Sequence, residues 1–145
     1  MKSVAVLGAG SFGTALAIHL AQRGLVTTLW GRKAEAVIEM AAERENAVYL
    51  PGCKFPPSLN CEPDLAKAIG AGEHLLIAVP SHALRALLQD VVPHMQSGQG
   101  LILACKGLEP ETGHLPHEVV AEVLVGNENP NRPLAVLSGP TFARE

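Results

Sequence analysis

Short apolar runs alternate along the chain with longer stretches in which apolar residues recur at helical spacing among polar ones. The short runs, each bounded by glycine, proline or a polar residue, predict strands, and the longer stretches predict helices. We expect strands at residues 4–7, 26–30, 74–79, 100–104 and 134–137, and helices at residues 14–22, 33–45, 65–69, 81–89 and 115–124. This alternation predicts right-handed crossovers and an α/β fold with a doubly wound, mostly parallel sheet of the Rossmann type.

The segment after the second predicted helix departs from this alternation. Pro51, Gly52, Pro56 and Pro57 predict an extended, irregular stretch around residues 49–52. We therefore expect a long loop there rather than a regular element.

Composition supports one domain across residues 1–145. The chain has 145 residues, of which 48% are hydrophobic and 17% are charged, which is enough for one buried core. Aromatic residues make up only 3%, so small aliphatic side chains supply most of the apolar volume. This suits helices packed closely on a parallel sheet whose strands are buried on both faces.

Charge and cysteine usage restrict the expected partners and location. A formal net charge of −3 with no basic block argues against nucleic acid or an anionic membrane as a partner and leaves small molecules. Cys53, Cys61 and Cys105 are odd in number and form no CxxC motif, so we expect reduced thiols rather than disulfides or zinc. The apolar run at residues 4–7 is far too short for a signal peptide or a membrane span. A cytoplasmic protein is therefore expected.

A GxGxxG motif lies between the first predicted strand and the first predicted helix. Gly8 permits a tight turn, Gly10 lets a diphosphate approach the backbone, and Gly13 allows the helix to pack closely on the strand. The unpaired amides of the first helical turn then face the anion. The motif in this context predicts a dinucleotide site, although a glycine-rich turn that only packs remains the alternative.

A basic pair follows the second predicted strand, where an NAD-specific site would place a carboxylate for the ribose hydroxyls. Arg32 and Lys33 stand there instead. A guanidinium binds a 2′-phosphate bidentately and stacks on adenine. We expect NADP to be accepted at least as well as NAD, the alternative being a solvated basic pair at a helix start.

Three loops at the carboxyl ends of predicted strands are expected to border one crevice: residues 78–81, 105–107 and 138–141. Pro80 is predicted to contact the cofactor there. Lys106 is the candidate catalytic residue, because its ammonium can reach a substrate carbonyl or phosphate; the alternative is a surface loop lysine. His114 and His117 do not predict a metal site, since Pro116 lies between them and no third ligand is evident.

The whole chain resembles the N-terminal domain of the bacterial-type NAD(P)-dependent glycerol-3-phosphate dehydrogenases. The resemblance rests on the order and spacing of six segments. These are GAGSFGTALA (8–17), WGR (30–32), NAVYLPG (46–52), AVPS (78–81), CKGLE (105–109) and SGPTFARE (138–145).

Carried over position by position, the resemblance implies a set of site residues. The cofactor, NADP or NAD, would contact Ser11, Phe12, Arg32, Lys33, Tyr49, Lys106 and Ala143, and the sugar phosphate would contact Lys106, Gly139 and Thr141. The implied reaction is reversible hydride transfer between the nicotinamide and dihydroxyacetone phosphate, giving sn-glycerol 3-phosphate for phospholipid synthesis. Lys106 would orient and polarise the substrate.

The resemblance also implies an all-helical C-terminal domain that supplies the lysine for proton transfer, and residues 1–145 do not contain it. We therefore expect the isolated residues 1–145 to bind cofactor weakly and to show essentially no turnover. A homodimer is left open, and bare apolar surface favours self-association of this piece. Two alternatives are a different two-domain dehydrogenase, of the ketopantoate reductase or hydroxyacyl-CoA dehydrogenase type, and a non-catalytic NAD(P)-sensing module.

Overall fold

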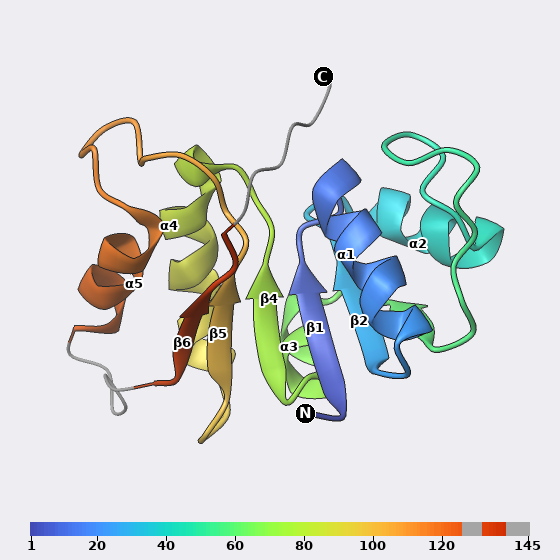
Figure 1. Cartoon of the computed structure of the whole chain (residues 1–145), viewed down its shortest axis with the longest axis horizontal. Coiled ribbons are helices and arrows are strands. Elements are labelled where there is room, and N and C mark those ends of the chain that lie inside the picture. The colour runs from blue at the N-terminus through green and yellow to red at the C-terminus, as the bar shows by residue number, and fades with distance from the viewer. Residues whose placement is uncertain (126–131, 139–145) are drawn as a thin grey trace.

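A computed structural model describes residues 1–125 and 132–138, and within them six strands form one sheet (Figure 1). The strands are β1 (Ser3–Leu7), β2 (Val26–Trp30), β3 (Leu59–Cys61), β4 (His74–Ile77), β5 (Gly100–Leu103) and β6 (Leu134–Val136). The helices are α1 (Ser11–Gln22), α2 (Ala34–Glu43), α3 (Leu65–Ala71), α4 (Ser81–Val91) and α5 (Pro116–Leu124), with a 3-10 turn, η1 (Val92–His94), after α4.

The order of the strands creates a crevice in the middle of the sheet. The order is β3-β2-β1-β4-β5-β6, and every pair of neighbours is parallel. The chain moves outward from β1 through β2 to β3, and then crosses back to β4 on the other side of β1. The loops that leave β1 and β4 therefore diverge, and ligands of such sheets bind in the crevice between them.

Alternate residues of the central strand face two separate cores. Ala5 and Leu7 pack with buried side chains of α3, α4 and α5, whereas Val4 and Val6 pack with buried side chains of α1 and α2. These four of the five β1 residues have no exposed surface. This alternation is the physical basis of the doubly wound α/β fold, with helices on both faces, that the sequence predicts.

The structure confirms the irregular stretch at residues 49–52 and adds, after the prolines, a strand that the sequence did not predict. Residues Leu59–Cys61 form β3, in register with Thr27–Leu29 of β2. Leu59 is fully buried, and the Thr27 N–H donates to the Ser58 carbonyl at 3.0 Å. So short a strand is stable only through this pairing, which local sequence does not reveal.

Several element ends also differ from the prediction. Helix α1 begins at Ser11 rather than Thr14, so the glycine motif runs directly into its first turn. Helix α2 ends at Glu43, because Arg44 adopts the left-handed conformation with φ 55°. Strand β4 stops at Ile77, and α4 continues to Val91.

No helix within the described ranges has the length and apolarity to cross a membrane.

Candidate functional site

The glycine motif forms a turn that the surrounding backbone holds tightly. Gly8 follows β1 with φ 126°, and its N–H donates to the Trp30 carbonyl of β2 at 2.9 Å. A Cβ at Gly8 would lie 2.3 Å from the Ala78 carbonyl oxygen, and one at Gly13 would lie 1.9 Å from the Gly8 carbonyl oxygen. Neither position has room for a side chain, so these two glycines allow β1, α1 and the end of β4 to meet.

Gly10 differs from both because its side faces open space. A Cβ built at Gly10 would have no neighbour within 4 Å. Gly10 is the N-cap of α1, and because it has no side chain it cannot cap the helix with a side-chain hydrogen bond. The first turn of α1, which the structure describes in full, contains no acidic residue. The unpaired amides and positive end of α1 therefore lie next to an open approach, which fits an anionic diphosphate.

The basic pair lies at the next strand end. β2 ends at Trp30. The next residue, Gly31, is buried against the glycine turn, where an added Cβ would lie 2.9 Å from the Cβ of Ala9. Arg32 and Lys33 follow, both exposed, and Lys33 is the N-cap of α2. The structure thus brings the two predicted 2′-phosphate residues to the same edge of the sheet as the glycine turn.

Asn46 joins this edge to the loop that follows α2, and the sequence did not single it out. Its side-chain Nδ2 donates to the Ala9 carbonyl and to Thr14 Oγ1, both at 2.9 Å. Its Oδ1 accepts the backbone N–H of Tyr49 at 3.2 Å. Tyr49 itself is 57% exposed, so its ring is available to a ligand.

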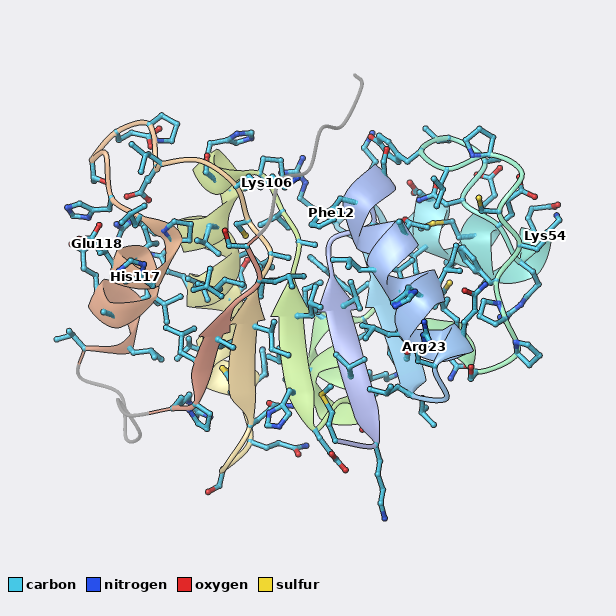
Figure 2. All side chains as sticks on the ribbon, in the orientation of Figure 1. Phe12, Arg23, Lys54, Lys106, His117 and Glu118 are labelled. Atoms are coloured by element: carbon cyan, nitrogen blue, oxygen red, sulfur yellow. The ribbon has the colours of Figure 1, made fainter. Side chains whose placement is uncertain are left out.

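Lys106 lies on the opposite side of the crevice, beyond the end of β5. Its Nζ is 4.7 Å from the centroid of the Phe12 ring in the first turn of α1, a cation–π distance. Figure 2 shows the two side chains facing each other above the ends of the central strands. The structure therefore brings together two residues that the sequence separately assigned to the cofactor site.

The loop that contains Lys106 borders both a neighbouring loop and a pocket. A Cβ at Gly107 would lie 3.7 Å from Ser81 Oγ, so the Pro80–Ser81 turn is adjacent, and Pro80 is exposed there. A pocket of about 320 Å³ lies beside the lysine, with Cys105, His117 and Ser138 among its lining residues. Three predicted site residues, Gly139, Thr141 and Ala143, lie outside the described residues.

A charged network, also missed from the sequence, anchors the loop after Lys106. The Arg85 guanidinium of α4 donates two hydrogen bonds of 2.7 Å to the Glu109 carboxylate and one of 2.7 Å to Glu122 of α5. Thr112 Oγ1 also donates to Glu109. These bonds lower the pKa of Glu109 to about 2, and the bond from Arg85 has the larger effect. Arg85 also lowers the pKa of Glu122.

Cysteines and histidines contribute other chemistry. Burial raises the pKa of the Cys61 thiol to about 11, and it also raises the pKa of Cys105. His114 Nδ1 lies 3.1 Å from a Glu122 carboxylate oxygen, a distance at which a protonated imidazole would form an ion pair. Within residues 1–125 and 132–138, no three His, Cys, Asp or Glu side chains are grouped as a metal site needs.

Comparison with known proteins decides the family. Residues 3–145 match the family model described as NAD-dependent glycerol-3-phosphate dehydrogenase N-terminus. The chain belongs to this family. The family predicted from the six sequence segments is thereby confirmed, and the alternative dehydrogenase types are not supported.

Curated relatives and a solved structure agree with the assignment. A glycerol-3-phosphate dehydrogenase (NAD(P)+) of Methylococcus capsulatus is 52% identical over 143 residues, which cover 98% of this chain and 42% of the relative. One from Pseudoalteromonas translucida is 50% identical over 144 residues, covering 99% and 42%. The crystal structure of glycerol-3-phosphate dehydrogenase from Coxiella burnetii superposes with a TM-score of 0.86 at 38% identity, covering 96% of this chain and 41% of that one. This chain therefore spans about two fifths of the length of such family members.

Proposed function

We propose that this chain binds the nicotinamide dinucleotide of a glycerol-3-phosphate dehydrogenase. A protein of the relatives' full length would transfer hydride between NAD(P)H and dihydroxyacetone phosphate to give sn-glycerol 3-phosphate for phospholipid synthesis. The observation that carries the proposal is the open approach to Gly10 and the start of α1, in a chain of this family. The curated relatives that support it are named as NAD(P)+-using enzymes.

The diphosphate would lie against the glycine turn. Gly8 and Gly13 shape the turn, and the amides around Gly10, Ser11 and Phe12 would hold the anion at the positive end of α1. This arrangement needs no cationic side chain at the diphosphate itself. The Phe12 ring, which is partly exposed beside Lys106, would border the bound cofactor.

The adenosine end would lie beside the end of β2. The exposed Arg32 and Lys33 would hold a 2′-phosphate, and the exposed Tyr49 would border the adenosine. A guanidinium makes charge-assisted bonds with phosphate that a diol cannot replace. NADP is therefore proposed as a cofactor alongside NAD.

The nicotinamide end would lie near Pro80 and Lys106. When bound, the nicotinamide supplies or accepts the hydride. The Lys106 ammonium, at the crevice edge, would bind the substrate and polarise its carbonyl oxygen, on which negative charge develops during reduction. Gly139, Thr141 and Ala143 complete the proposed substrate and nicotinamide contacts, on the strength of the family resemblance.

The cytoplasm and a homodimer are the proposed location and assembly. Unpaired cysteines, with Cys105 buried, support a reducing compartment. The exposed apolar residues Leu134, Val136 and Leu137 of β6 and its end support self-association of residues 1–145. Light scattering would give the molar mass of residues 1–145 in solution. A monomeric mass at high concentration would contradict their proposed self-association.

Replacement of Arg32 tests the cofactor site. Calorimetric titration of Arg32→Ala with NADPH is expected to show an affinity lower by roughly 10- to 100-fold, because charge-assisted bonds to the phosphate are lost. Affinity for NADH should change by less than about threefold, since NADH lacks that phosphate.

Arg23→Ala is the matched control, because Arg23 is an exposed arginine at the other end of α1 (Figure 2). Its affinities should equal those of the unaltered chain. Unchanged NADPH binding by Arg32→Ala would remove the role of Arg32. Failure of the unaltered chain to bind either dinucleotide at millimolar concentration would remove the proposed function.

A further inference from the structure

We infer that Asn46 positions the glycine turn for the dinucleotide and couples that turn to the Tyr49 loop. This inference rests on the proposed function, since it assigns a positioning residue to the proposed cofactor site. Asn46 is 3% exposed, so its side chain touches no ligand directly and acts through the groups that it holds.

Every hydrogen-bonding group of the Asn46 side chain is in use. The Nδ2 amide donates to two oxygens, those of the Ala9 carbonyl and the Thr14 hydroxyl, and the Oδ1 atom accepts from Tyr49. The backbone carbonyl of Asn46 also accepts the Leu50 N–H at 2.8 Å. One buried amide therefore joins three segments: the glycine turn, the first turn of α1 and the loop after α2.

The bond to Ala9 determines which way a peptide of the turn faces. In a trans peptide the N–H of one residue points opposite to the preceding carbonyl. With the Ala9 carbonyl held by Asn46, the Gly10 N–H points away from this buried side chain. If the peptide rotated, a carbonyl dipole would replace an N–H where an anion is proposed to bind, at a residue with no Cβ to hinder the rotation.

The chemistry requires a neutral amide. A carboxylate at position 46 has no hydrogen to donate, so it would face the Ala9 carbonyl oxygen as a second acceptor, although the Thr14 hydroxyl could turn to donate to it. It would also place a buried negative charge next to the proposed diphosphate position. Asn46→Asp, which has nearly the same shape, is therefore expected to weaken dinucleotide binding more than Asn46→Ala.

The selectivity of the effect distinguishes Asn46 from Arg32. The glycine turn would hold the diphosphate, which NADH and NADPH share. Loss of Asn46 is therefore expected to weaken both ligands by the same factor, whereas loss of Arg32 is expected to weaken NADPH much more than NADH.

Gln99 provides a matched control elsewhere in the fold. Its side chain is also 3% exposed, and its Nε2 donates to the Ile69 and Gly72 carbonyls at 2.8 and 2.6 Å. Its Oε1 accepts the Gln96 N–H at 3.1 Å. Gln99 thus repeats the bonding pattern of Asn46, but it lies before β5, at the amino ends of the strands and away from the crevice.

The experiment compares the variants Asn46→Ala, Asn46→Asp and Gln99→Ala by urea denaturation and by calorimetric titration with NADH and NADPH. All three are expected to lower the urea midpoint. Asn46→Ala should weaken both dinucleotides by roughly tenfold and Asn46→Asp by more, as expected when buried donors or acceptors lose their partners. Gln99→Ala should leave both affinities within about twofold. A purely structural role for Asn46 would give the same affinities as Gln99→Ala, and that result would overturn the inference.

Thr14→Val keeps the test decisive if Asn46→Ala does not fold. This change removes one acceptor of Asn46. Because valine nearly matches threonine in shape, the fully buried position of Thr14 stays filled. A loss of affinity of about threefold or more for both dinucleotides is expected, and an unchanged affinity would count against the inference. If the unaltered chain binds neither dinucleotide, the proposed function itself fails; if it binds both and Asn46→Ala binds equally well, only the inference fails.

Discussion

The two walls of the crevice are both loops that leave parallel strands, yet they are held by different forces. On the glycine side, Gly8 and Gly13 meet backbone atoms at distances that exclude any side chain, and the neutral amide of Asn46 holds the turn. On the lysine side, the Arg85–Glu109 ion pair holds the loop after Lys106.

This difference separates how the two walls respond to change. A wall held by close backbone contact responds to added volume, because the interior cannot yield by an ångström. A wall held by charge responds to pH, because protonation of the carboxylate removes one partner of the pair. Steric variants and pH therefore test the two walls independently.

The largest effect is expected from Gly13→Ala on the glycine wall. The added methyl would lie 1.9 Å from the Gly8 carbonyl oxygen, so α1 must move away from β1. Overpacking of this kind costs about 3 kcal/mol, and urea denaturation should show it together with the loss of NADPH binding.

Gly10→Ala is the paired control on the same turn. Its methyl meets nothing within 4 Å, and its extended backbone, at φ −77° and ψ −177°, suits alanine. The free energy of unfolding of Gly10→Ala should remain within about 0.5 kcal/mol of that of the unaltered chain. Its dinucleotide affinity should fall, because the methyl occupies the proposed diphosphate approach. Equal dinucleotide affinity in Gly10→Ala and the unaltered chain would contradict this use of the open space.

A smaller, pH-dependent effect is expected from Glu109→Gln on the lysine wall. The pKa of Glu109 is lowered from 4.5 to about 2 by Arg85 and Thr112. Its ionised form therefore stabilises the fold fully above pH 4.5, and this contribution is lost as the pH falls toward 2. The urea midpoint of Glu109→Gln should be lower than that of the unaltered chain at pH 7, and the two should converge in acid.

The exposed carboxylate of Glu39 on α2 offers the control for that titration. Glu39→Gln removes one carboxylate charge, as Glu109→Gln does, but among the described residues Glu39 forms no ion pair. As the pH is lowered, the urea midpoint of Glu39→Gln should stay parallel to that of the unaltered chain. A constant gap between Glu109→Gln and the unaltered chain from pH 7 to pH 3 would show that the ion pair does not hold the lysine wall.

The smallest effect concerns the contact that joins the two walls. Phe12→Leu and Lys106→Met, alone and together, form a double-mutant cycle for the cation–π contact at 4.7 Å. A coupling free energy of about 0.5–1 kcal/mol is expected for such an exposed pair, measured by urea denaturation. A coupling of zero would mean that the two walls meet without stabilising each other.

The local pattern predicted the central elements well, and the outer ones less so. β1 and α1 were expected because an apolar run, a glycine turn and a helix-forming segment follow one another. β3 was missed because its three residues become a strand only by pairing with β2. At the other edge, β6 was expected from its apolar residues, yet Leu134–Val136 are all exposed in the described chain.

The site residues divide in the same way. Gly8, Gly10, Gly13, Arg32 and Lys106 were proposed from the sequence, because each belongs to a segment that follows a recognisable strand and suits a dinucleotide site. Their roles stay predictions until binding is measured. Asn46 and Glu109 were not found, since asparagine and glutamate are ordinary in loops and only their partners give them a role.

Sequence alone determined the strand and helix alternation, the glycine turn and the family, because each depends on residues close together in the chain or on their order. Tertiary structure alone decided what holds the two walls. Asn46 reaches Ala9 across 37 residues, and Arg85 reaches Glu109 across 24. Such contacts form only when the sheet brings distant loops to one edge, so no local pattern of residues can encode them.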